Sequence, residues 1–133
     1  MRIKVKATLI STVETIVNQY PMRHWAEKVA CEALQRKGLQ LIDHNFSTAL
    51  GEIDLIMRDG STLVFIEVRQ RRSAAYGLAE ETIEHRKQTR IRRVANQFLQ
   101  RDSKGYDQQC RFDVLAVNGD QTQKTIQWIK SAF

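Results

Sequence analysis

Two apolar segments joined by a turn, within residues 51–72, constrain the fold of this chain more than any other feature. Their sequence is GEIDLIMRDGSTLVFIEVRQRR, and Asp59 and Gly60 lie between the two apolar runs. An Asp-Gly pair in this position is the strongest short-range signal for a β-hairpin. The segment therefore predicts two antiparallel strands.

The predicted register gathers acidic side chains on one face of the hairpin. With the Asp-Gly pair as the loop, Glu52 lies opposite Glu67, and Asp54 lies opposite Phe65. Opposed side chains share a face, and side chains alternate along each strand. One face is therefore expected to be apolar and the other acidic. The apolar face is predicted to hold Ile53, Leu55, Val64, Ile66 and Val68, and the acidic face Glu52, Asp54, Phe65, Glu67 and Arg69.

Three carboxylates on one face of a hairpin predict a metal site. Glu52 and Glu67 are expected to have Cβ atoms about 5 Å apart, with Asp54 diagonal to Glu67 at about 7 Å. Such like charges destabilise a strand pair unless a cation compensates them, and Mg²⁺ or Mn²⁺ prefers oxygen ligands. The alternative is a solvated ion pair between Glu67 and Arg69, which contributes about 0–1 kcal/mol. The acids lie inside apolar runs, which favours the metal site.

The motifs GEIDLI, VFIEVRQRR, SAAYG and CRFDVLAV resemble those of the YraN-like family of small uncharacterised bacterial proteins, from about Trp25 to the C-terminus. An acid on one hairpin strand followed by E-x-K on the next is the signature of the PD-(D/E)XK nuclease superfamily. The resemblance implies a restriction-endonuclease-like fold, similar to that of Holliday-junction resolvases. This is an α/β layered fold with a central mixed β-sheet flanked by helices.

The resemblance also implies roles for the acidic residues. Asp54 and Glu67 are expected to be metal ligands, and Glu52 an accessory acid. Glu27, on the first predicted helix, matches a superfamily glutamate that points toward the metal. The implied activity is a metal-dependent, structure-selective nuclease acting on DNA or RNA phosphodiesters.

One position departs from the superfamily motif, because Arg69 stands where the lysine is expected. An arginine binds phosphate bidentately but stays protonated, so it cannot transfer a proton as the lysine can. Lys87 projects near the apolar side of the long predicted helix at its start. We expect Lys87 to reach toward the site and partly replace the missing lysine.

The charge of the chain favours a polyanionic partner. There are 21 Lys and Arg residues against 15 Asp and Glu, a net charge of +6. Nucleic acid, with DNA preferred over RNA, is the expected partner. The alternative is that the basic residues are solvated surface charges. The predicted nucleic-acid contacts are Arg71, Arg72 and Tyr76 after the hairpin, and Arg86, Arg90 and Arg93 along one flank of the long helix.

The remaining pattern predicts an N-terminal extension, residues 1–20, that is helical, and a single nuclease-like domain, residues 21–133. In that domain we expect a helix from Pro21 to near Gly38, a strand at 39–46, the hairpin, a helix at 79–101, and strands at 111–117 and 124–129. Apolar runs are too short for a membrane span. Two distant cysteines are typical of reduced thiols in a cytoplasmic protein.

Two other functions remain open at this point. The protein could be a non-catalytic nucleic-acid-binding module that retains the nuclease fold. It could also be an interaction protein whose N-terminal helix forms a homodimer. Three results separate these functions. A nuclease cleaves nucleic acid when a divalent ion is present, and a binding module binds it in a salt-dependent way without cleavage. An interaction protein changes its oligomeric state when residues 1–20 are removed.

Overall fold

A computed structural model describes residues 22, 24–72, 83–101 and 107–133 of the chain. The elements are α2 (Trp25–Arg36), β1 (Gln40–Thr48), β2 (Gly51–Asp59), β3 (Thr62–Arg71), α3 (His85–Gln100), β4 (Cys110–Gly119) and β5 (Lys124–Ile129). The strands form one sheet in the order β1-β2-β3-β4-β5, in which β3 and β4 are parallel and the other neighbours antiparallel. The predicted α/β fold with a mixed sheet is confirmed, and it is consistent with a restriction-endonuclease-like layered fold.

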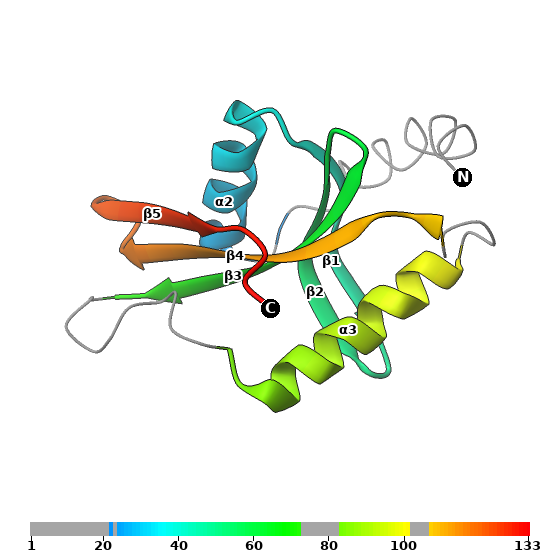
Figure 1. Cartoon of the computed structure of the whole chain (residues 1–133). Helices are drawn as coiled ribbons and strands as arrows, with labels where there is room; N and C mark the ends of the chain where they lie inside the picture. Colours follow the sequence, from blue (N-terminus) through cyan, green and yellow to red (C-terminus); the bar gives the residue numbers. More distant parts are fainter. Residues whose placement is uncertain (1–21, 23, 73–82, 102–106) are drawn as a thin grey trace.

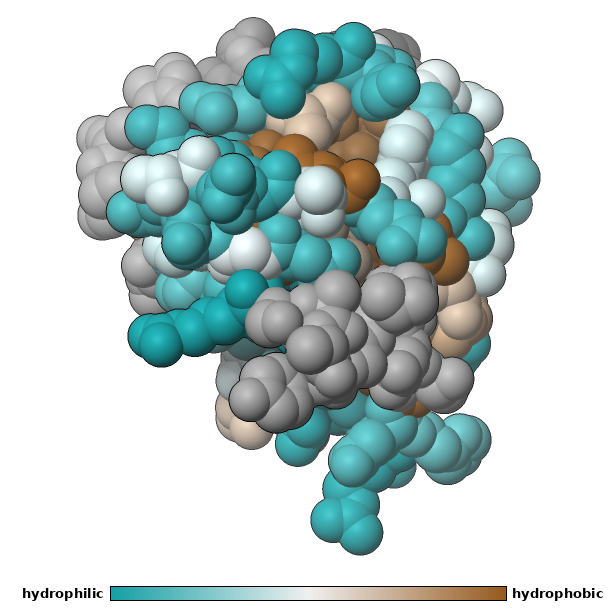
Figure 2. Space-filling model, turned by 90° about the vertical axis from the view of Figure 1, so that its left-hand side faces the viewer, coloured by the Kyte–Doolittle hydropathy of each residue, from teal (hydrophilic) through white to brown (hydrophobic). Residues whose placement is uncertain are grey.

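The two helices cover opposite faces of the sheet, α2 on one side and α3 on the other (Figure 1). The prediction of one apolar and one acidic face is therefore wrong, because both faces are buried under a helix. The core under α2 includes Leu55, Met57, Val64, Ile66, Leu115 and Val117. The core under α3 includes Ile42, Ile53, Ile56, Leu63 and Phe65. Figure 2 shows the face on the side of the β4–β5 turn, which is mostly hydrophilic with a small hydrophobic strip.

Helix α2 begins later than its sequence predicts. It starts at Trp25, after His24, whose Nδ1 accepts a hydrogen bond from the backbone N–H of Ala26 at 3.1 Å. The histidine ring thus caps the helix. Pro21, which the sequence places in the first turn, lies outside the described residues.

The end of α2 agrees with the prediction. Gly38 has a φ of +97°, and its N–H donates to the Gln35 carbonyl at 2.9 Å. The Leu39 N–H donates to the Leu34 carbonyl at 3.1 Å, which completes a Schellman motif. Glycine adopts this left-handed conformation without strain.

The buried side of α2 differs from the predicted one. Helical spacing predicts a buried side of Trp25, Val29, Ala33 and Leu34, but the buried residues are Ala26, Ala30, Cys31 and Leu34. Two alanines on this side let the helix lie close to the sheet. Burial also raises the pKa of the Cys31 thiol to about 11, with the nearby Glu32 charge acting in the same direction. The thiol is therefore protonated at neutral pH.

Helix α3 also starts later than predicted, at His85 after Glu84. The sequence predicts an acidic start, with Glu80, Glu81 and Glu84, and a basic end that match the helix dipole. Glu84 is the N-cap, but the first turn contains no acidic residue and the last turn no basic one; Glu80 and Glu81 lie outside the described residues. Helical spacing also predicts a buried stripe of Ile83, Ile91, Val94, Phe98 and Leu99. It is confirmed within the helix at Ile91, Val94 and Phe98, which are buried with Ala95.

The hairpin turn lies one residue later than predicted, which shifts the strand pairing by two residues. Asp59 pairs with Thr62 and Leu55 with Ile66, so the loop is Gly60-Ser61 instead of Asp59-Gly60. Gly60 has a φ of +62°, and a glycine at the first of two loop positions is typical of a type II′ turn. Glu52 is therefore not opposite Glu67.

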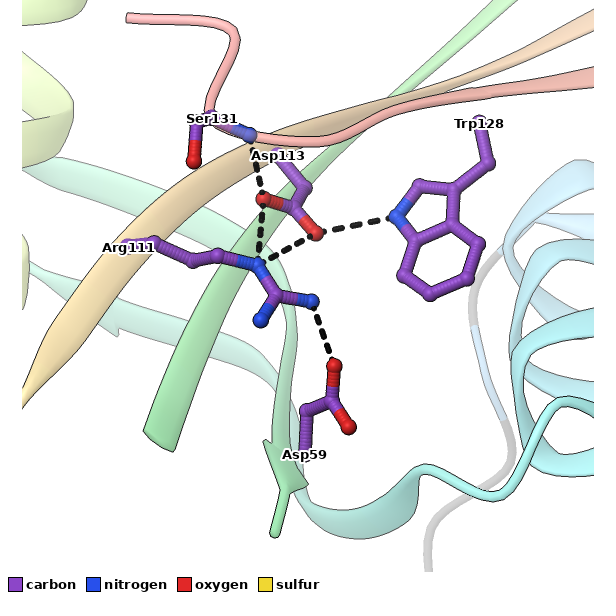
Figure 3. Close-up of polar contacts among 5 residues, drawn as sticks. All are labelled: Asp59, Arg111, Asp113, Trp128 and Ser131. Carbon is purple, nitrogen blue, oxygen red and sulfur yellow. Dashed lines mark hydrogen bonds and ion pairs between the residues drawn. The ribbon is translucent and has the colours of Figure 1, made fainter. Parts of the chain in front are cut away.

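A buried charge network joins β4 to the end of the chain (Figure 3). Asp113 is fully buried, and its carboxylate accepts hydrogen bonds from Arg111 Nε at 3.0 Å, Trp128 Nε1 at 2.9 Å and the Ser131 N–H at 2.9 Å. Arg111 also donates to Asp59 Oδ2 at 2.8 Å. The sequence predicts a structural role for Asp113, in an ion pair with Arg111 or with a helix arginine, and the observed partner is Arg111.

Replacing Asp113 with asparagine is expected to lower the free energy of unfolding by about 2–4 kcal/mol, because an amide cannot accept from all three donors. Urea unfolding measures the change. Asp107→Asn, at an exposed position, removes the same charge and serves as the control. Equal stability of the two variants would contradict a structural role for this carboxylate.

The predicted helix within residues 1–20, its role in a homodimer and the contact by Tyr76 lie outside the described residues and stay predictions. Within the described part of the chain, no helix is long and apolar enough to cross a membrane.

Candidate metal centre

The regular alternation of side chains along strand β2 is interrupted at Asp54. Ile53 belongs to the core under α3, whereas Leu55, two residues later, belongs to the core under α2. Regular alternation would place both on one face. The paired residues of β2 and β3 run from Asp59 and Thr62 to Leu55 and Ile66. The sheet therefore opens next to Asp54.

Where β2 and β3 separate, the Asp54 side chain accepts a hydrogen bond from the backbone of β3. Its Oδ2 accepts a hydrogen bond from the Val68 N–H at 2.8 Å. A carboxylate thus satisfies a donor of β3 that a carbonyl would satisfy in a regular ladder. This bond fixes Asp54 between the two strands.

The environment of Asp54 disfavours its negative charge. Burial, followed by the neighbouring charge of Glu67, raises its pKa from 3.8 to about 8, against the opposing effect of the Val68 N–H. The charges of Glu27 and Glu52 raise the pKa further. Asp54 is therefore largely protonated at neutral pH unless a cation lies beside it.

Three carboxylates from two elements meet at this point. One oxygen each from Glu27 on α2 and from Glu52 and Asp54 on β2 lies within 4.8 Å of the other two. Oxygens that share one Mg²⁺ at about 2.1 Å lie at most about 4.2 Å apart. A small inward movement of these half-buried side chains would bring them into that range, so the donor set fits a hard divalent cation.

Asn45 joins two of these carboxylates and was missed by the sequence analysis. Its Nδ2 donates to Glu27 Oε1 at 3.0 Å and to Glu52 Oε2 at 2.9 Å. Its Oδ1 lies 3.0 Å from His44 Nδ1, which orients the amide. The backbone of Asn45 has a φ of +51°, a conformation that asparagine tolerates better than most residues. No local signal in the sequence marks Asn45, because the same strand also contains Asp43 and His44.

Glu67 has a different partner. Its Oε2 forms an ion pair with Lys87 Nζ from the first turn of α3. Glu67 is only 9% exposed, while the Lys87 side chain is 43% exposed. The structure thus brings Lys87 to the acidic residues. It groups Asp54 with Glu27 and Glu52, while among these charges that of Glu67 raises the pKa of Asp54 most. The metal pair of Asp54 and Glu67 stays a prediction.

The predicted arginines lie on or just beyond β3 and on α3, and they differ in exposure. Arg69 and Arg71 are half-buried on β3, and Arg72 is exposed just beyond it. On α3, Arg90 lies over the start of β2, because a Cβ added to Gly51 would meet its side chain at 3.1 Å. The other two, Arg86 and Arg93, are exposed.

Comparison with known proteins places the chain in a family. A family model described as "Uncharacterised protein family UPF0102" matches residues 26–117. The chain belongs to the UPF0102 family. A UPF0102 protein of Pseudomonas syringae pv. syringae is 45% identical over 109 residues, 81% of this chain and 89% of the relative. One from Nitrosococcus oceani is 44% identical over 108 residues, 81% of this chain and 87% of the relative.

The part of the chain that matches the UPF0102 model contains the whole candidate centre. Glu27, Asn45, Glu52, Asp54 and Lys87 all lie within residues 26–117. The UPF0102 family is the YraN-like family that the sequence motifs resemble, so that resemblance is confirmed. Membership of the PD-(D/E)XK superfamily is consistent with this family.

Proposed function

We propose that this UPF0102 protein is a metal-dependent nuclease that acts on nucleic-acid phosphodiesters, with DNA preferred over RNA. The observation that supports this most directly is the meeting of Glu27, Glu52 and Asp54 where the sheet opens. The negative charges of the three carboxylates repel one another, and a divalent cation between them would offset that repulsion. The net charge of +6 favours a polyanionic substrate.

Each residue of the centre has a separate part in this proposal. Glu27, Glu52 and Asp54 would hold Mg²⁺ or Mn²⁺, which when bound polarises a phosphate and lowers the pKa of a water molecule. Asn45 positions two of the carboxylates through its amide. Arg69, two residues after Glu67 on β3, is suited to binding a phosphate oxygen pair.

The test is cleavage of branched, flapped, single-stranded and blunt duplex DNA by the purified full-length chain, with excess Mg²⁺ or Mn²⁺. The proposal expects products with the metal and none with a chelator. A parallel RNA series tests the preference for DNA. Lack of cleavage of every substrate with both metals would contradict the nuclease.

One observation favours a second function, a nucleic-acid-binding module without catalysis. The Lys87 ammonium already neutralises Glu67, and protonation of Asp54 removes a second charge, so the centre is tolerated without a metal. This function expects binding that weakens steeply with salt but does not depend on divalent ions. Loss of the Asp54 charge would then leave affinity unchanged or improve it.

Lys87 is expected to contribute to cleavage as the missing lysine. Lys87→Gln should lower the cleavage rate by about a hundredfold, because it removes the proton donor and leaves Glu67 unpaired. Lys87→Arg keeps the ion pair but cannot release a proton. Rates are measured under single-turnover conditions across pH.

The arginine variant separates the two roles of Lys87. If Lys87→Arg cleaves as slowly as Lys87→Gln, Lys87 transfers a proton. If Lys87→Arg cleaves at a near-normal rate, the role of Lys87 is purely electrostatic. Lys28→Gln, at an exposed position on α2, makes the same change away from Glu67. If this control slows cleavage as much as Lys87→Gln does, the assignment of Lys87 is wrong.

A further inference from the structure

A second polar site lies beside the acidic centre. A pocket of about 550 Å³ opens between the start of α2, the end of β3 and the β4–β5 turn. This volume is within the range of roughly 300–1,000 Å³ typical of ligand sites. The lining residues are His24, Trp25, Gln70, Arg72, Asp120, Gln121 and Thr122.

One wall of the pocket is aromatic. The rings of His24 and Trp25 are stacked, with centroids 5.8 Å apart and planes at 28°. The His24 ring is held by its capping bond to Ala26, and Trp25 packs on the core under α2. Both rings are therefore positioned before any ligand arrives.

The opposite wall is a rigid turn. Asp120 Oδ1 accepts hydrogen bonds from the Thr122 hydroxyl at 2.8 Å and from the N–H groups of Thr122 and Gln123 at 2.9 and 2.8 Å. Gly119 has a φ of +119°, and a Cβ there would meet the Gln123 carbonyl oxygen at 2.2 Å. The turn thus requires glycine and holds the Asp120 carboxylate in place.

The floor connects the pocket to the acidic centre along β3. Gln70 Nε2 donates to the Gly119 carbonyl at 2.9 Å, which ties β3 to the turn. Gln70 is two residues beyond Val68, whose N–H is bound by Asp54, a separation of about 7 Å along a strand. Arg72, two residues further, supplies a cation to the lining.

We propose that this pocket binds one unpaired nucleotide of a nucleic-acid strand. Its base would stack on Trp25 and His24, and its phosphate would lie on Arg72. The Asp120 carboxylate repels a phosphate from the turn wall but accepts hydrogen bonds from the N–H groups of a base. A base stacked within a duplex cannot enter, so the pocket selects strands with a single-stranded segment.

This inference rests on the proposed function, because it names the substrate class of the same nuclease. It places an unpaired base about 7 Å along β3 from the acidic centre, so the scissile phosphate would lie close to an unpaired nucleotide. A flap or a branch provides such a nucleotide next to a duplex, whereas a blunt duplex does not.

The experiment measures binding in a chelating buffer, so that it does not depend on cleavage. Anisotropy of a labelled single strand is compared with that of a blunt duplex of the same length and sequence, using the full chain. We expect at least about tenfold tighter binding of the single strand, and a free nucleoside monophosphate should compete poorly for it. Trp25→Ala should weaken single-strand binding by about five- to hundredfold.

Two further variants keep the test independent of folding. Trp25→Phe keeps a stacking ring, so its affinity should stay within about threefold of the original protein. Quenching of tryptophan emission by the strand should disappear in this variant, because Trp128 does not line the pocket. Arg72→Gln should weaken binding severalfold more than Arg36→Gln, the same change at an exposed position at the end of α2.

Equal affinity for the single strand and the duplex, or quenching that persists in Trp25→Phe, would overturn the pocket assignment. Competition by free nucleoside monophosphate as effective as the strand would assign the pocket to a mononucleotide and would also overturn it. Selective binding of the single strand without cleavage would support the pocket assignment and contradict the proposed nuclease activity. Cleavage that is insensitive to Trp25→Ala would support the nuclease activity and contradict the pocket assignment.

Discussion

Asp54→Asn is expected to reduce divalent-dependent cleavage by about a thousandfold or more. A bound divalent ion contributes several kcal/mol of transition-state charge stabilisation, and about 4 kcal/mol corresponds to this factor. Asparagine keeps the shape of the side chain and can still accept from the Val68 N–H through its amide oxygen. The variant therefore removes the charge that a metal needs while the opening of the sheet is retained.

The control for this variant is Asp107→Asn, which makes the same change at an exposed position. Single-turnover cleavage of a flapped substrate is measured for both variants and the original protein at saturating Mn²⁺. Nucleic-acid affinity in chelator should not fall in Asp54→Asn, because Asp54 is already largely protonated at neutral pH without a cation, and the change adds no negative charge. Cleavage by Asp54→Asn at the rate of the control would exclude a metal centre at this position.

The sequence was sufficient for the fold but not for the details of the site. Alternating apolar strands and an Asp-Gly turn predict the hairpin, and the order of elements predicts a mixed sheet. The register depended on which residue of the turn takes a positive φ, and Gly60 takes it at the first loop position rather than the second. Moving the turn by one residue shifts the strand pairing by two residues, so Glu52 does not lie opposite Glu67.

The composition of the acidic cluster could not be read from strand alternation alone. Ile53 and Leu55 belong to different cores, so the side-chain alternation of β2 is interrupted at Asp54. A pattern of regular alternation does not predict this interruption. Glu27 entered the prediction only through resemblance to a family. Asn45 was missed because its contacts span 7 and 18 residues of sequence, and no local pattern reports them.

The stability of the protein is expected to fall as the pH rises from about 4 to about 8 in the absence of divalent ions. The folded-state pKa of Asp54 is raised by burial and by Glu67 from 3.8 to about 8. The folded state therefore binds more protons than the unfolded state within this window, and such a group loses stability with rising pH. The full effect is about 6 kcal/mol, and it levels off above the folded-state pKa.

A divalent ion should reverse this loss, because it binds the carboxylate and competes with the proton. Urea unfolding at about pH 5 and about pH 8, with chelator and with excess Mg²⁺, measures both effects. Mg²⁺ is expected to stabilise the protein more at the higher pH, by about 2–3 kcal/mol at a hundredfold excess over its Kd. Asp54→Asn should abolish both the Mg²⁺ effect and most of the pH dependence.

The pH dependence that remains in Asp54→Asn should come partly from Asp43, because burial also raises the pKa of that carboxyl. Asp43 lies at the irregularity of β1, and it is not among the three clustered carboxylates. Asp43→Asn is therefore expected to reduce the pH slope while it leaves the response to Mg²⁺ intact. If Asp43→Asn removes the Mg²⁺ effect and Asp54→Asn does not, the metal binds elsewhere, and Glu27, Glu52 and Asp54 are a purely structural group.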